Sequence, residues 1–135
     1  MYFFVSNKKF DNGTILNPRI PQNRLTIKGT EDFLTPRVCI CKSIIGALNS
    51  TEIYDKHKTI YVYTCNPNSV ITPTEKQVSD CIFTGEEWSL EPVVLNLFTI
   101  LYVSKETLSD NIIEWKFKDK KSIGFYNFKL YQRVY

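Results

Sequence analysis

Two arginines that each follow a proline lie in one irregular segment, residues 16–39, and their side chains could hold an anionic ligand. These are Arg19 and Arg37, and Arg24 lies between them. A guanidinium presents a planar fork of donors that matches a phosphate or a carboxylate. Proline restricts its own φ and biases the residue before it toward extended backbone, which lowers the entropy lost when a loop is ordered on binding. Arg19 and Arg37 are therefore candidate ligand-binding residues.

The same segment offers its arginines a structural role. An acidic pair, Glu31 and Asp32, precedes Arg37 by a few residues. An arginine that pairs with either carboxylate would fasten a long loop to the body of the protein. For each arginine taken singly, the sequence leaves both roles open.

A second candidate is the stretch Thr84–Trp88, whose glycine and two glutamates indicate a turn with acidic side chains. A carboxylate beside a tryptophan at a strand end could bind ribose hydroxyls or act as an acid or base. Glu86 is thus a candidate ligand-binding residue, and a catalytic one only if the protein is an enzyme. Tyr63 and Trp88 would stack on a base. The alternative is a solvated turn in which Trp88 fills the core.

Ser43 marks a predicted step from a strand, residues 37–41, into a short helix. Its hydroxyl and the amides that follow could hold an anion at the helix N-terminus. The commoner role of a serine at this position is to cap the helix. Ser43 is kept as a candidate ligand-binding residue.

The cysteines and the one histidine indicate no metal site. Cys39 and Cys41 would share one face of a strand, but zinc sites usually combine two closely spaced pairs, and Cys65 and Cys81 stand alone. We expect buried, reduced thiols. His57 lies among lysines, and the chain has no phosphate-binding loop, dinucleotide fingerprint, zincin motif or nucleophile elbow. A conventional hydrolase or metalloenzyme is therefore not expected.

Length and composition predict one α+β domain over residues 1–135. Aromatic residues make up 14% of the chain, which favours a sheet-rich fold. The net charge of +3 comes from scattered lysines, so nucleic-acid binding is not expected. No apolar run approaches the roughly 20 residues of a membrane span. The first residues lack the features of a secretory signal, which predicts a cytoplasmic protein.

The expected fold is a mostly antiparallel, twisted sheet with one or two short helices. Hydrophobic periodicity predicts a helix over residues 43–48 and leaves residues 72–79 as a loop or a single helical turn. The strands are expected at residues 2–6, 37–41, 59–65, 93–103, 112–118 and 124–134.

A set of motifs occurs in a fixed order over roughly residues 1–103. They are Tyr2–Ser6, Leu16–Pro21 with Asn23, Glu31-Asp32, Thr35–Cys39, Ser43-Ile44 with Ala47-Leu48, Ile60–Tyr63, and Thr84–Glu86 with Trp88–Val93. This order resembles a family of small uncharacterised proteins found in phages and in Firmicutes, and the resemblance is specific as a set of motifs.

The layout is more distantly similar to ADP-ribosyltransferase-like folds, which surround a nicotinamide nucleotide. That similarity implies that Ser6 lies where such enzymes often have histidine or arginine. It also implies that Ser43 falls near their second motif and Glu86 at their glutamate. Since serine cannot supply the group usually found at the first position, the similarity favours binding over reaction.

The leading hypothesis is a phage or mobile-element accessory protein of the anti-defence type. It would bind a nucleotide or an NAD-derived ligand such as an ADP-ribose derivative. One alternative is an active ADP-ribosyltransferase. Another is an inhibitor that binds a host nuclease or a defence complex, either as a monomer or as an oligomer. The aromatic residues that could anchor such an interface are Trp115, Tyr126, Tyr131 and Tyr135.

Overall fold

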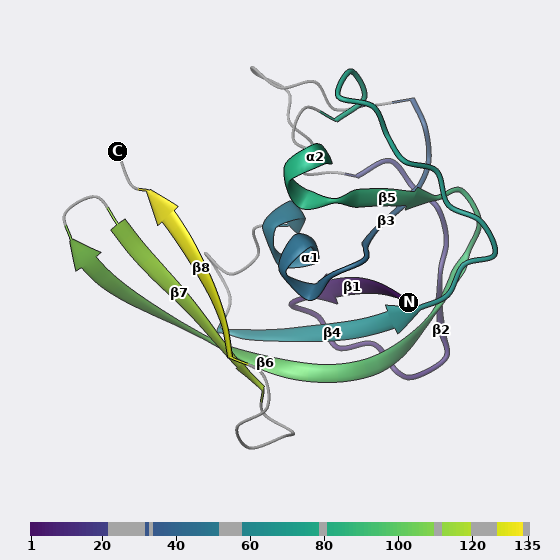
Figure 1. Ribbon diagram of the computed structural model, residues 1–135. Coiled ribbons are helices and arrows are strands. Elements are labelled where there is room, and N and C mark those ends of the chain that lie inside the picture. The colour runs from purple at the N-terminus through teal and green to yellow at the C-terminus, as the bar shows by residue number, and fades with distance from the viewer. Residues whose placement is uncertain are drawn as a thin grey trace.

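Eight strands and two short helices follow one another along the part of the chain that the computed structural model describes (Figure 1). The described residues are 1–21, 32, 34–51, 58–78, 81–109, 112–119 and 127–133. The elements, in chain order, are β1 (Tyr2–Ser6), β2 (Thr14–Leu16), β3 (Val38–Cys41), α1 (Ile44–Thr51), β4 (Thr59–Cys65), α2 (Cys81–Thr84), β5 (Glu86–Ser89), β6 (Val93–Ser109), β7 (Ile112–Asp119) and β8 (Asn127–Arg133).

The strands form one sheet in the order β5-β3-β1-β4-β6-β7-β8, and β2 pairs with the beginning of β6. Every strand pairing in the described residues is antiparallel. The prediction of a mostly antiparallel α+β domain is therefore confirmed. No helix in the described part of the chain is both long and apolar enough to cross a membrane.

The central strand β4 shows the predicted alternation of side chains. Ile60 and Val62 point into a core cluster that α1 covers with Ala47 and Leu48. Tyr63 and the other alternate residues of β4 point into a second cluster on the opposite face. Because successive strand residues face opposite sides, one strand separates the two cores.

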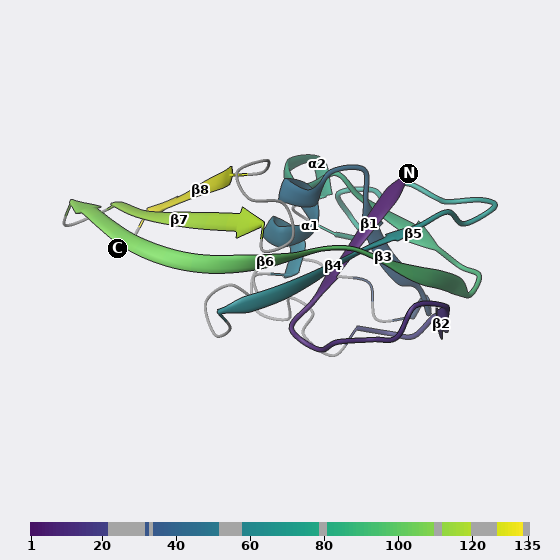
Figure 2. The same ribbon diagram turned by 90° about the horizontal axis from the view of Figure 1, so that it is seen from below.

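Strand β6 contributes side chains to both core clusters, because a bulge interrupts its pairing with β4. The register shifts between Val62, which pairs with Thr99, and Tyr63, which pairs with Leu97. Such a bulge changes which face the following residues occupy. Beyond its contact with β4, β6 continues with β7 and β8 as an arm to one side of the body (Figure 2). The expected end of this strand at residue 103 is therefore too early, because pairing with β7 extends it to Ser109.

Helix α1 begins where the sequence predicts and lies against β1 and β3. The amide of Gly46 donates to the Ser43 hydroxyl at 3.0 Å, which is the expected N-cap. Gly46 is required for another reason. A Cβ atom at this position would collide with the backbone carbonyl oxygen of Thr84, at the end of α2. The glycine thus lets α1 approach the segment that leads into β5.

The turn expected over Thr84–Trp88 is limited to its beginning, and its glutamates are not solvated, whereas Trp88 does fill the core. Gly85 does form a turn, with φ of +68°, but Glu86–Ser89 is a strand whose four residues are all buried. Pairing with β3 on one side and a bridge to Ile71 on the other stabilise this strand. Both contacts are long-range, so the local glycine and acidic residues could not predict them.

Candidate functional site

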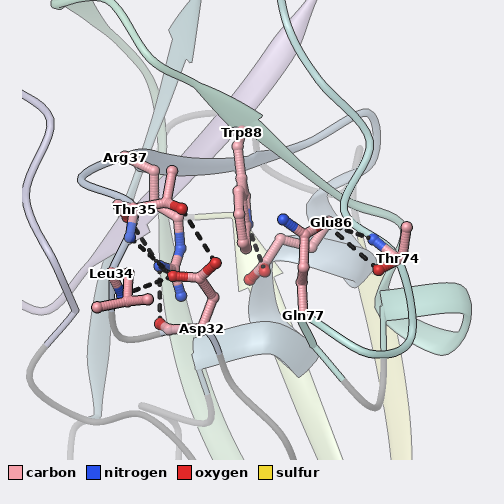
Figure 3. A network of polar contacts seen from close by, with 8 residues as sticks. All are labelled: Asp32, Leu34, Thr35, Arg37, Thr74, Gln77, Glu86 and Trp88. Atoms are coloured by element: carbon pink, nitrogen blue, oxygen red, sulfur yellow. Dashed lines mark hydrogen bonds and ion pairs between the residues drawn. The ribbon is translucent and has the colours of Figure 1, made fainter.

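The buried side chain of Arg37 stabilises the C-terminal part of the irregular segment, residues 16–39, by hydrogen bonds to its backbone. The residue is 1% exposed, and its Nη1 donates to the carbonyl oxygens of Asp32 and Thr35, each at 2.9 Å (Figure 3). The same nitrogen lies 3.7 Å from Oδ1 of Asp32. A buried guanidinium needs such partners, and here residues a few positions earlier in the chain provide them. The proposed pairing of an arginine with Asp32 is therefore present.

Asp32 closes the turn that Arg37 holds. Its Oδ1 accepts from the amides of Leu34 and Thr35, each at 2.7 Å, and its Oδ2 accepts from the Thr35 hydroxyl at 3.0 Å. The Thr35 amide contributes most to lowering the pKa of Asp32, and the Leu34 amide, the Thr35 hydroxyl and the charge of Arg37 lower it further. Asp32 is thus held as a carboxylate.

The arginine segment meets β5 through a stacked contact. The Arg37 guanidinium lies over the Trp88 ring, 4.0 Å from its centroid, and the Trp88 Nε1 donates to Oε2 of Glu86 at 2.9 Å (Figure 3). Trp88 is fully buried. The register explains the meeting, since Cys39, two residues after Arg37, is opposite Trp88. The segment and the Glu86 strand are therefore neighbours.

Arg19 joins this group through its backbone only. Its amide and carbonyl exchange hydrogen bonds of 3.0 and 2.9 Å with those of Arg37, although 18 positions separate the two residues. Arg19 itself is exposed. The two predicted ligand-binding arginines thus come together, but only Arg19 presents its side chain to solvent.

Tyr63 is fully buried in the second core, where it binds the loop that contains Phe10. Its hydroxyl accepts from the Phe10 amide at 2.6 Å, and the two rings meet edge to face. Burial raises the pKa of Tyr63. With both Tyr63 and Trp88 inside the protein, their stacking on a base stays a prediction and would require the rings to become accessible. Ser43 is exposed, and its hydroxyl caps α1.

The acidic residue that sequence reasoning passed over is Glu87. It lies on the face of β5 opposite to Glu86 and is 9% exposed. Its Oε1 is 3.3 Å from the ammonium of Lys42, whereas its Oε2 is buried with no hydrogen-bond partner among the described residues. A hydrogen bond to this carboxylate is the main cause that raises the pKa of Tyr2. Recognising residues 86–89 as a strand would have separated the two glutamates.

All four cysteines are thiols. Burial raises the pKa of the Cys65 thiol to about 11, which makes it a poor nucleophile at neutral pH. Cys41 and Cys81 are buried, and Cys39 is half-buried against Trp88. The described residues contain no group of three or more His, Cys, Asp and Glu side chains placed to hold a metal ion.

Of the aromatic residues proposed for a protein interface, Trp115 is the one whose side chain the structure describes, and it is buried. Trp115 is 5% exposed in the first core, with Lys105 over its ring. Tyr131 lies in β8. Tyr126 and Tyr135, like Arg24, Glu31 and His57, lie outside the described residues.

No protein-family model, curated protein or solved structure matches this chain.

Proposed function

We propose that this chain is a binding protein for a nucleotide or an NAD-derived ligand, and that Arg19 contacts the phosphates. The contact of Arg37 with Trp88 supports this proposal, because it joins the arginine segment to the Glu86 strand. In this arrangement the buried Arg37 side chain positions the arginine segment. The backbone bridge to Arg37 holds Arg19, whose side chain is exposed at the protein surface. A fixed loop loses less entropy when it binds.

Binding without catalysis suits the surroundings of Glu86. Its carboxylate accepts from the indole of Trp88 and is 7% exposed, so this residue is already used inside the protein. A glutamate that stabilises a transition state must reach the reacting atoms. In a phage or a mobile element, a protein of this kind would sequester a signalling nucleotide of the host. An active ADP-ribosyltransferase would instead need Glu86 to turn toward the ligand.

Calorimetry tests the proposal with three ligands: ADP-ribose, NAD and a cyclic dinucleotide. We expect at least one of them to bind, and Arg19→Ala to weaken that binding roughly tenfold, the effect of one hydrogen bond to a charged group. Lys118→Ala removes an equal charge from the exposed side of β7 and should leave the affinity unchanged. The absence of heat with all three ligands at millimolar concentration would refute the proposal.

A further inference from the structure

Three polar side chains meet at one end of the sheet, on the face turned away from Glu86. They come from three neighbouring strands: Tyr2 belongs to β1, Lys42 directly follows β3, and Glu87 belongs to β5. The register brings them together. Phe3 is opposite Cys41, so the adjacent residues Tyr2 and Lys42 lie on one face of the sheet. Glu87 is opposite Ile40, which lies on that same face two residues before Lys42. We call these three residues the Glu87 cluster.

One oxygen of the Glu87 cluster is left without a donor. The Glu87 side chain is 11% exposed, its Oε1 lies 3.3 Å from the Lys42 ammonium, and the Tyr2 hydroxyl hydrogen-bonds to the same carboxylate. Oε2 is buried and accepts no hydrogen bond from the described residues. A buried acceptor without a donor destabilises a protein by about 1–3 kcal/mol, and more when it is charged. A hydroxyl group of a ligand would supply this donor once the carboxylate turns Oε2 toward the solvent.

The cluster also presents a positive charge to solvent. The Lys42 side chain is 71% exposed, and an ammonium has three donors, so it can contact an anion while it approaches Glu87. Lys42 directly precedes Ser43, the N-cap of α1, where the helix dipole also favours an anion. A buried acceptor and an exposed cation therefore lie side by side.

We propose that the Glu87 cluster is a subsite for a sugar phosphate, with Glu87 binding ribose hydroxyls and Lys42 binding the phosphate. This deepens the proposed function and rests on it, because it assigns the ribose phosphate of the nucleotide to these residues. The ribose-binding carboxylate is then Glu87, and Glu86 belongs to the interior. The Tyr2 phenol borders the site as a further hydrogen-bonding group.

Titration of the whole protein with ribose 5-phosphate and, separately, with ADP-ribose tests this subsite. We expect both ligands to bind, Glu87→Gln to weaken each roughly tenfold, and Lys42→Met to weaken ribose 5-phosphate at least as much. Glu91→Gln and Lys118→Met are matched controls at exposed positions and should bind as the wild type does. Thermal unfolding of each variant verifies that it is folded.

The two ligands separate the subsite from the proposed function. If ADP-ribose binds and both Glu87→Gln and Lys42→Met bind it as the wild type does, the subsite is wrong and the proposed function stands. If ribose 5-phosphate binds with the expected losses but no nucleotide binds, the subsite stands and the function is wrong. If neither ligand binds at millimolar concentration, both are wrong.

Discussion

Glu86 and Glu87 are consecutive residues of one strand with almost equal burial, 7% and 9% exposed, and very different surroundings. Glu86 points toward Trp88, whose ring carries Arg37 on its face. Glu87 points to the other side of the strand, toward an exposed lysine, and keeps one oxygen without a hydrogen bond from the described residues. The alternation of a β-strand produces the whole difference.

Almost equal burial thus accompanies two different sets of contacts, and we propose a structural role for Glu86 and a ligand-binding role for Glu87. On the Glu86 side, the Glu86 carboxylate, the Asp32 carboxylate and Nη1 of Arg37 hydrogen-bond to indole, amide and carbonyl groups of the protein. On the Glu87 side, the carboxylate is paired with Lys42 and Tyr2, and its buried Oε2 accepts no hydrogen bond from the described residues. If the first side is structural and the second binds a ligand, changes on the first should affect stability, and changes on the second should affect affinity.

The largest expected effect is the loss of Arg37. Arg37→Ala removes the donor of two carbonyl oxygens and the cation over Trp88, and it leaves a cavity. We expect it to lower the free energy of unfolding by about 3 kcal/mol, as measured by urea denaturation. The control is Lys42→Ala, which removes the cation on the Glu87 side and should lower the free energy of unfolding by only about 1 kcal/mol, because Lys42 itself is largely exposed. Equal losses in the two variants would contradict the comparison.

A smaller loss of stability is expected from Gly46→Ala. The added methyl group would press on the Thr84 carbonyl, just before β5, and would force α1 away from this strand. Overpacking of this kind lowers the free energy of unfolding by about 1–3 kcal/mol. Asn49→Ala in the same helix is the control, since it adds helix propensity without a collision. A Gly46→Ala variant as stable as the control would place the close approach of α1 in doubt.

The smallest effect expected on the Glu86 side is a dependence of protein stability on pH, which arises from Asp32. Because hydrogen bonds lower the pKa of Asp32 in the folded protein, its stabilising effect is fully present above the unfolded value of about 4. It is lost as the pH falls from there through the folded pKa. Asp32→Asn should therefore flatten the pH dependence of the melting temperature below about pH 4. An unchanged dependence would show that the Asp32 turn does not act in this way.

Local sequence signals predicted much of the fold. The alternation in Thr59–Cys65 identified the strand between the two cores, and Ser43 identified the start of α1. These features depend on neighbouring residues, which the sequence displays directly.

The errors arose where distant residues decide the structure. Glycine and two glutamates are typical of a turn, and only pairing with β3 makes Glu86–Ser89 a strand. Likewise, the contact of Arg37 with Trp88 joins residues that are far apart in the chain. The arginine segment was recognised as a feature of interest, but whether Arg37 faces a ligand or the interior depended on this contact.

The central claim is that Glu87, and not Glu86, binds the ligand. The most direct measurement compares Glu86→Gln with Glu87→Gln in calorimetric titrations with ribose 5-phosphate. The two variants remove the same charge from adjacent positions. We expect Glu86→Gln to bind as the wild type does and Glu87→Gln to bind roughly tenfold more weakly, the effect of one hydrogen bond to a charged group. An affinity that falls in Glu86→Gln and is unchanged in Glu87→Gln would contradict the claim.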